Sequence, residues 1–175
     1  GRAGPTGINA KGDVFNVRVE DDFRGTGPVT DFEPWAGSVT FDPSFDWNFD
    51  TAGPVPGKPD FISTAVHEIG HILGIGTAPI FEAIGAGAAF DGPNALAVNG
   101  GTAIPLESDL GHVVDGFDGD TVLMDPTNVI GTRKSPTDID KALLADIGYE
   151  IAGFAKQGST PPIATQGDDG TIFGT

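Results

Sequence analysis

The segment His67-Glu68-Ile69-Gly70-His71 provides the strongest structural prediction in this sequence. In an α-helix, four residues turn the chain by about 400°, so the two imidazoles lie about 40° apart around the axis and about 6 Å apart along it. Both rings can then bind one metal ion. Glu68 points roughly 100° away from His67, beside such an ion and not toward it. The segment therefore predicts a helix with two metal ligands and an adjacent carboxylate base.

The flanking residues support a helix from about residue 60 to residue 74. Pro59 precedes it, Asp60 or Ser63 can cap its first turn, and Gly74 suits a left-handed turn at its end. A broad apolar face predicts that this helix is buried on most sides. That face consists of Ile62, Ala65, Val66, Ile69, Ile72 and Leu73. The alternative interpretation is a core helix whose two histidines have ordinary hydrogen-bond partners.

Composition limits the classes of partner. The chain has 175 residues, enough for one domain with a core, and 9 basic against 25 acidic residues give a net charge of −16. Such a surface repels nucleic acid and anionic membranes, and it leaves carboxylates free for calcium. No apolar run approaches the ~20 residues that a membrane span needs, so we expect no membrane insertion. Because there is no cysteine, a zinc site must use His, Asp or Glu.

Other elements are predicted on both sides of the helix. Residues 14–20 alternate between apolar and polar side chains and predict a half-buried strand, and residues 37–41 predict a second short strand. Residues 80–84 predict a short helical turn. Residues 1–155 form the predicted domain, and residues 156–175, rich in Gly, Thr, Pro and Asp, form a predicted linker or tail.

A last helix is predicted to begin after residue 135. Ser135 is its expected cap, Pro136 lies in its first turn, and Asp138 lies at the positive end of its dipole. Gly148 is expected to end it. Its predicted buried stripe consists of Ile139, Ala142, Leu143 and Ile147.

A catalytic zinc site needs a third protein ligand. The chain has three histidines, so His112 is the first candidate to join His67 and His71. Glu107 is an alternative that would give a site of two histidines and one glutamate, as in thermolysin-like gluzincins. Further carboxylate alternatives are Glu82, Asp91 and Asp109.

The pattern His67-Glu68-x-x-His71-x-x-Gly74, with a methionine downstream, resembles the metzincin clan of zinc endopeptidases. Metzincins usually carry a third ligand three residues after the glycine, where this chain has Thr77. In leishmanolysin-like metzincins the third histidine follows an insertion shortly before the methionine turn.

His112 lies twelve residues before Met124 and matches that arrangement. The segment from residue 123 to residue 126, with residues 135–137 and 144–149, is similar to exported bacterial, matrixin-like relatives. The resemblance covers residues 37–150 and implies a secreted bacterial protein with a protein or peptide substrate.

The resemblance also implies an α+β fold, in which a small twisted mixed sheet packs on the active-site helix. A loop-rich C-terminal subdomain with a methionine turn and a final helix would follow. By the same resemblance, His67, His71 and His112 bind Zn²⁺ and Glu68 is the general base. Met124 is the apolar floor beneath the ion, and residues 37–41 are the edge along which substrate lies.

Two departures from the family shape these expectations. No long helix is predicted in the first 59 residues, so we expect either a reduced member or a missing N-terminal part, and Gly1 shows no signal peptide. With no cysteine, latency through a Cys–zinc bond is impossible within this chain.

Two acidic segments have the character of calcium loops. Asp115, Asp118 and Asp120 alternate with turn glycines, which suits either bound Ca²⁺ or a solvated acidic turn. Residues 167–174 resemble the start of a glycine-aspartate calcium repeat.

Two functional classes follow from the sequence. The first is a zinc-dependent endopeptidase that uses Glu68. The second is a catalytically silent, peptidase-derived binding or surface-layer module with structural zinc or calcium. The intact Glu68 argues against the second, because a structural site has no use for a base.

Overall fold

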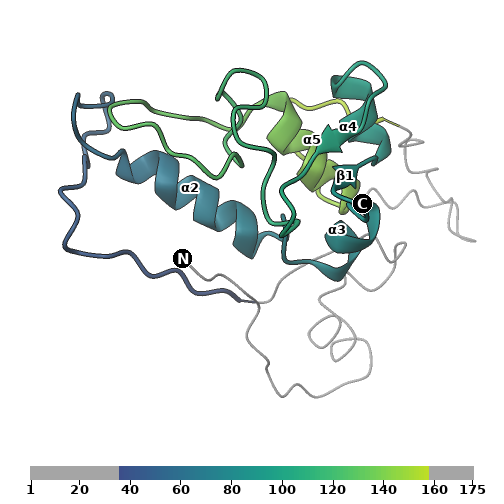
Figure 1. Ribbon diagram of the computed structural model, residues 1–175, viewed down its shortest axis with the longest axis horizontal. Helices are drawn as coiled ribbons and strands as arrows, with labels where there is room; N and C mark the ends of the chain where they lie inside the picture. Colours follow the sequence, from purple (N-terminus) through teal and green to yellow (C-terminus); the bar gives the residue numbers. More distant parts are fainter. Residues whose placement is uncertain (1–35, 158–175) are drawn as a thin grey trace, which may run out of the picture.

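The computed structural model describes residues 36–157, and Figure 1 shows their arrangement. The predicted strand at residues 14–20, the tail after residue 157 and the acidic segment 167–174 lie outside the described residues. No helix among the described residues is long and apolar enough to cross a membrane. The elements in order are α2 (Phe61–Ile72), α3 (Pro79–Ile84), β1 (Ala89–Phe90), α4 (Pro93–Val98), β2 (Ile104–Pro105) and α5 (Asp138–Asp146).

Helix α2 is the predicted metal-bearing helix, and its ends follow the sequence signals. The carboxylate of Asp60 accepts a hydrogen bond from the backbone N–H of Ser63 at 2.9 Å, so Asp60 is the N-cap. Gly74 follows the helix with φ +113°. The expectation that α2 is buried on most sides is wrong for the described residues. Only Ser63 and Gly70 are buried, and Ile69 is 47% exposed, because α2 lies at the side of the described fold (Figure 1).

Residues 37–41 run alongside α2 as extended chain. A Cβ added to Gly37 would lie 2.5 Å from Cγ2 of Ile72, and the Phe41 ring lies 4.8 Å from that of Phe61. The segment thus contacts side chains of a helix, and no described residue pairs with its backbone in a ladder. The prediction of a strand at residues 37–41 is therefore wrong within the described part of the chain.

The described part contains one small sheet, and it lies away from α2. β1 and β2 pair antiparallel, with Ala89 opposite Pro105 and Phe90 opposite Ile104. The mixed sheet expected against the metal-bearing helix is not found among residues 36–157. The implied metzincin fold therefore stays a prediction.

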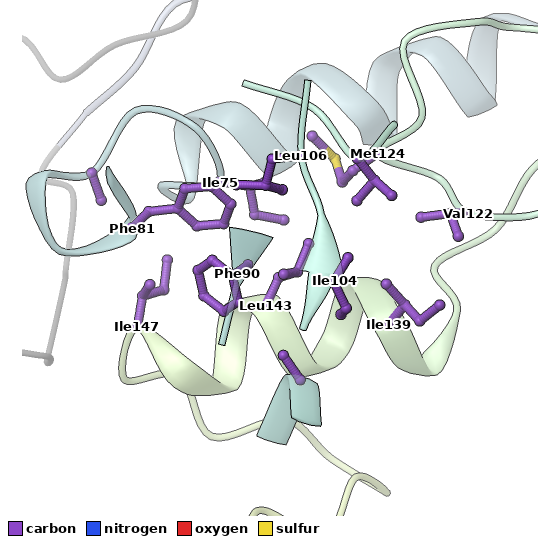
Figure 2. Packing of buried hydrophobic residues seen from close by; sticks show 13 residues of the cluster. Ile75, Phe81, Phe90, Ile104, Leu106, Val122, Met124, Ile139, Leu143 and Ile147 are labelled. Carbon is purple, nitrogen blue, oxygen red and sulfur yellow. The ribbon is translucent and has the colours of Figure 1, made fainter. Parts of the chain in front are cut away.

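The apolar core lies between α5, the β1–β2 pair and the turn after α2 (Figure 2). Aromatic rings of Phe81 and Phe90 pack with their centroids 4.6 Å apart at its centre. The predicted stripe of α5 is confirmed, since all four of its members are buried. The larger core members are Ile75, Phe81, Phe90, Ile104, Leu106, Val113, Val122, Met124, Leu143 and Ile147.

The start of α5 differs from the prediction. Thr137 is the N-cap in place of Ser135, because it forms a capping box with Asp140. The Asp140 carboxylate accepts the Thr137 backbone N–H at 2.7 Å, while the Thr137 hydroxyl accepts the Asp140 N–H at 3.4 Å. The predicted end is confirmed, since Gly148 follows α5 with φ +117°.

Candidate metal centre

Three imidazoles converge at one point. His67 and His71 project from successive turns of α2, and His112 comes from the loop between β2 and residue 113. Nε2 of His71 lies 3.2 Å from Nε2 of His67 and 3.2 Å from Nε2 of His112. One ligand atom from each residue lies within 4.8 Å of the others. The structure therefore brings together the three histidines named from the sequence.

In His67 and His71, the hydrogen bond made by Nδ1 determines that Nε2, which faces the centre, carries a lone pair. Nδ1 of His67 lies 2.8 Å from the carbonyl oxygen of Leu123, and Nδ1 of His71 lies 2.9 Å from that of Ile75. A carbonyl oxygen only accepts, so each Nδ1 carries the proton and donates. Each Nε2 then has a lone pair, and these lone pairs point toward one another. Carbonyl partners of this kind fix ring orientation around metal ions.

The spacing of these nitrogens suits zinc. Zn–N bonds of about 2.0–2.1 Å in tetrahedral geometry place ligand nitrogens roughly 3.3–3.4 Å apart. The two Nε2–Nε2 distances of 3.2 Å are close to that value. Two facing lone pairs cannot hydrogen-bond to each other, so a cation between them would remove their repulsion. The donor set and its geometry therefore fit a zinc ion.

Burial favours the neutral, metal-binding form of two of the rings. Burial lowers the pKa of His67, the hydrogen bond to Leu123 opposes this, and the neighbouring imidazoles lower it further. Burial also lowers the pKa of His71, against the opposing effect of its hydrogen bond to Ile75. Both rings are consequently held as unprotonated ligands near neutral pH.

A close backbone approach brings His112 to α2. Gly76 has φ +69°, and a Cβ added there would lie 2.5 Å from Cα of Gly111. The loop that carries His112 is closed by the Glu107 N–H, which donates to the His112 carbonyl at 2.9 Å. The chain can turn and pass this closely at residue 76 only because that residue has no side chain.

The alternative ligands lie elsewhere. The Thr77 hydroxyl donates to the His71 carbonyl at 2.6 Å, so it closes the end of α2. Oε1 of Glu107 accepts the Asp115 N–H at 3.0 Å. Asp109 lies on the outer side of His112, with Oδ2 3.6 Å from Nδ1. None of the four carboxylates considered from the sequence belongs to the described group of converging ligand atoms.

Met124 lies beneath the metal-bearing helix and is fully buried (Figure 2). Its carbonyl accepts the Val113 N–H at 3.0 Å, which connects the methionine turn to the residue after His112. The Asp140 carboxylate accepts the N–H groups of Leu123 and Met124 at 3.1 and 3.0 Å. One buried carboxylate on α5 thus holds the turn whose carbonyl orients His67. This role of Asp140 was not predicted from the sequence, because the spacing of Thr137 and Asp140 signals only the start of a helix.

Glu68 follows His67 on α2, and its role as a base beside the centre stays a prediction. It lines, together with His67, a cavity of about 100 Å³ between α2 and the loop after Met124. Its Oε2 atom is buried. Glu68 and His67 thus border the same cavity.

The acidic loop differs in detail from its prediction. Carboxylate oxygens of Asp115, Asp120 and Asp125 lie within 4.8 Å of one another, and Asp118 is not in this group. Asp125 is 2% exposed and accepts the Gly116 N–H at 2.8 Å. Calcium at this loop stays a prediction.

Comparisons with protein families, with curated proteins and with solved structures found no match to this chain. The geometry of the three imidazoles and the position of Glu68 are therefore the basis for assigning a function.

Proposed function

We propose that this protein is a zinc-dependent endopeptidase. The observation that carries the proposal is the convergence of the Nε2 atoms of His67, His71 and His112, with Glu68 one residue beyond His67 on the same helix. Three histidine ligands leave a fourth tetrahedral position open, which is typical of catalytic zinc sites and not of closed structural ones. Zinc is the best match among common ions because the donor set is three imidazoles with no thiolate.

Each group of the chain has a role in peptide hydrolysis. Zinc, when bound, polarises the substrate carbonyl and lowers the pKa of the attacking water. The carboxylate of Glu68 accepts a proton from that water as its oxygen bonds to the carbonyl carbon. The same carboxyl group then gives the proton to the leaving amine as the C–N bond breaks. His67 and His71 keep their orientation through their outer carbonyl partners, and none of the three histidines takes a proton in this scheme.

The alternative is a peptidase-derived module in which zinc is structural. The exposed acidic loop is consistent with such a binding role. The presence of a carboxylate beside the open position favours the enzyme, because a closed structural site would place a fourth ligand there.

One experiment separates the two. Zinc-loaded protein is incubated with an unfolded protein such as casein, and Glu68→Ala is compared with wild type and with Glu82→Ala, a control at an exposed residue of α3. We expect cleavage by wild type and by Glu82→Ala, and a loss of at least ~100-fold in Glu68→Ala with zinc content unchanged. Folded, zinc-loaded wild type that cleaves no member of a broad peptide library would favour the binding module.

A further inference from the structure

The cavity beside Glu68 has walls from two separate segments. Ser63 and Thr64 of α2 form one side, and residues 125–128, which follow Met124, form the other. The Asn128 side-chain amide donates to the Thr64 hydroxyl at 2.6 Å, and that hydroxyl donates to the Asp60 carbonyl at 3.1 Å. This chain of hydrogen bonds fixes the distance between the two walls. The width of the cavity is therefore set by named polar contacts.

Its size limits what can enter. The volume is about 100 Å³. An enclosed protein cavity of ~150 Å³ accepts benzene, so a group smaller than a phenyl ring fits this one best. Side chains of the size of serine, threonine, asparagine or valine satisfy that limit.

One buried residue that lines the cavity, Lys134, carries hydrogen-bond donors. Nζ of Lys134 donates to the Thr127 carbonyl at 2.8 Å and lies 3.4 Å from Oδ1 of Asp125. The two side chains are 4% and 0% exposed. An ammonium group has three N–H donors, and these two are its partners in the described structure, so a third donor is left for an acceptor in the cavity.

The charged residues around the cavity favour a neutral acceptor over an acidic one on the bound side chain. The carboxyl groups of Asp125 and Glu68 line the cavity, and Lys134, which pairs with Asp125, is the one lysine or arginine among its described lining residues. The whole chain carries −16. A carboxylate brought into this cavity would meet two carboxylates, whereas a hydroxyl or amide oxygen would accept from Lys134 without that repulsion.

We infer that this cavity binds the side chain of the substrate residue next to the scissile bond and selects serine, threonine or asparagine there. This inference rests on the proposed peptidase function. The cavity begins at His67 and Glu68, so a side chain inside it belongs to a residue adjacent to the bond under attack. Phenylalanine is too large for the cavity, and neither phenylalanine nor leucine offers an acceptor to Lys134. The carboxylates that line the cavity repel aspartate. A site built to hydrogen-bond its substrate strongly rejects analogues that lack the acceptor.

The test is a profile of cleavage sites. The zinc-loaded full chain is given a randomised peptide library, and both new ends of every product are sequenced. We expect Ser, Thr and Asn to exceed Leu and Phe by at least ~10-fold at one side of the cut bond. A flat profile, or a preference for large apolar residues on both sides, would overturn the inference and leave the peptidase function standing.

A second measurement distinguishes failure of the proposed peptidase function from failure of the inferred selectivity. If no peptide is cut, the proposed function fails, and binding then decides the cavity's role. Short peptides with Ser, Asn or Leu at one position are titrated into the zinc-loaded protein, and backbone NMR signals of Thr64 and Asn128 are followed. Tighter binding and larger shifts with Ser and Asn than with Leu support the cavity's selectivity, and equal binding overturns it.

A matched pair of variants tests the wall. Asn128 and Val129 are both exposed, and Asn128 lines the cavity whereas Val129 does not. Asn128→Ala breaks the contact with Thr64 and widens the cavity, so we expect its preference over leucine to fall several-fold. Val129→Ala is expected to keep the wild-type profile. An unchanged profile in Asn128→Ala would contradict the role of this wall in selection.

Discussion

The sulfur of Met124 occupies the space in which a side chain at residue 70 would begin. A Cβ added to Gly70 would lie 2.6 Å from Sδ of Met124 and 3.3 Å from its Cε. Gly70 lies between His67 and His71 of α2 and is buried. The methionine can contact the helix axis at this turn only because residue 70 has no side chain. The glycine in the motif thus has a packing reason independent of helix propensity.

Gly70→Ala is therefore expected to destabilise the protein, although alanine is the better helix former. Overpacking costs ~1–3 kcal/mol, and helix propensity returns up to ~1 kcal/mol, so the free energy of unfolding should fall by about 1–2 kcal/mol. Denaturant unfolding of metal-free protein measures this. The control is Gly53→Ala, where nothing lies within 4 Å of the added Cβ. A Gly70→Ala protein more stable than wild type would contradict the described packing of Met124.

Asp140→Asn should loosen the methionine turn and weaken zinc binding. The carboxylate accepts four donors, from the N–H groups of Leu123 and Met124 and from the N–H and hydroxyl of Thr137. An amide can accept on only one atom, so at least one buried donor loses its partner, at a cost of ~1–3 kcal/mol. Because Leu123 orients His67, zinc affinity should fall ~10–100-fold.

Competition with a chelating dye measures that affinity, and Asp138→Asn is the control. Asp138 is two residues away, is exposed, and forms a surface pair with Lys141 at 2.8 Å. Its loss should cost less than ~1 kcal/mol and leave zinc affinity unchanged. If Asp140→Asn lowered stability with full zinc affinity, its role would be limited to holding the fold.

Removal of the third imidazole separates the two candidate ligand sets. His112→Ala should lower zinc affinity by more than ~100-fold, since loss of even an indirect partner costs ~10–100-fold. Glu107→Gln should keep the affinity, because its carboxylate accepts the Asp115 N–H and lies outside the converging group. Isothermal titration with zinc measures both. The opposite result, with affinity lost in Glu107→Gln alone, would favour a gluzincin-like site.

Helix α2 and the positions of His67 and His71 on it could be predicted because their signals are local. The spacing of His67 and His71, the cap at Asp60 and the glycine after the helix all act within one or two turns. His112 could be named because the chain has no fourth histidine. The same locality explains the confirmed stripe and end of α5.

What the sequence did not predict depends on contacts between distant residues. One such contact is the hydrogen bond from Leu123 to Asp140, and another is the close approach of Gly76 to Gly111. Neither contact is signalled by a pattern of neighbouring residues. Residues 37–41 have the composition of a strand, but in the described structure they pack on side chains of α2. Strand propensity requires a partner backbone to be realised, and tertiary packing decides whether one is present.

Acid should weaken the fold through the cap of α2. Burial raises the pKa of Asp60, but hydrogen bonds from Arg133 and Ser63 outweigh it and lower the pKa to about 2, from 3.8 in an unfolded chain. A lowered pKa in the folded state stabilises the protein above the unfolded value, and that contribution is lost as pH falls through the folded value. For Asp60, the contribution is complete above pH 3.8 and is lost as pH falls toward about 2.

Arg133→Met tests this assignment, because Arg133 donates to both carboxylate oxygens of Asp60. The shortest of these bonds to Asp60 is 2.7 Å. The variant should be less stable at pH 7 and should lose less stability between pH 4 and pH 2, since the pKa of Asp60 rises toward its ordinary value. Urea unfolding of metal-free protein at each pH excludes effects of zinc release. Lys58→Met is the control, because its pair with Asp46 is exposed. If the free energy of unfolding fell by the same amount with pH in wild type and Arg133→Met, a group other than Asp60 would cause the loss of stability in acid.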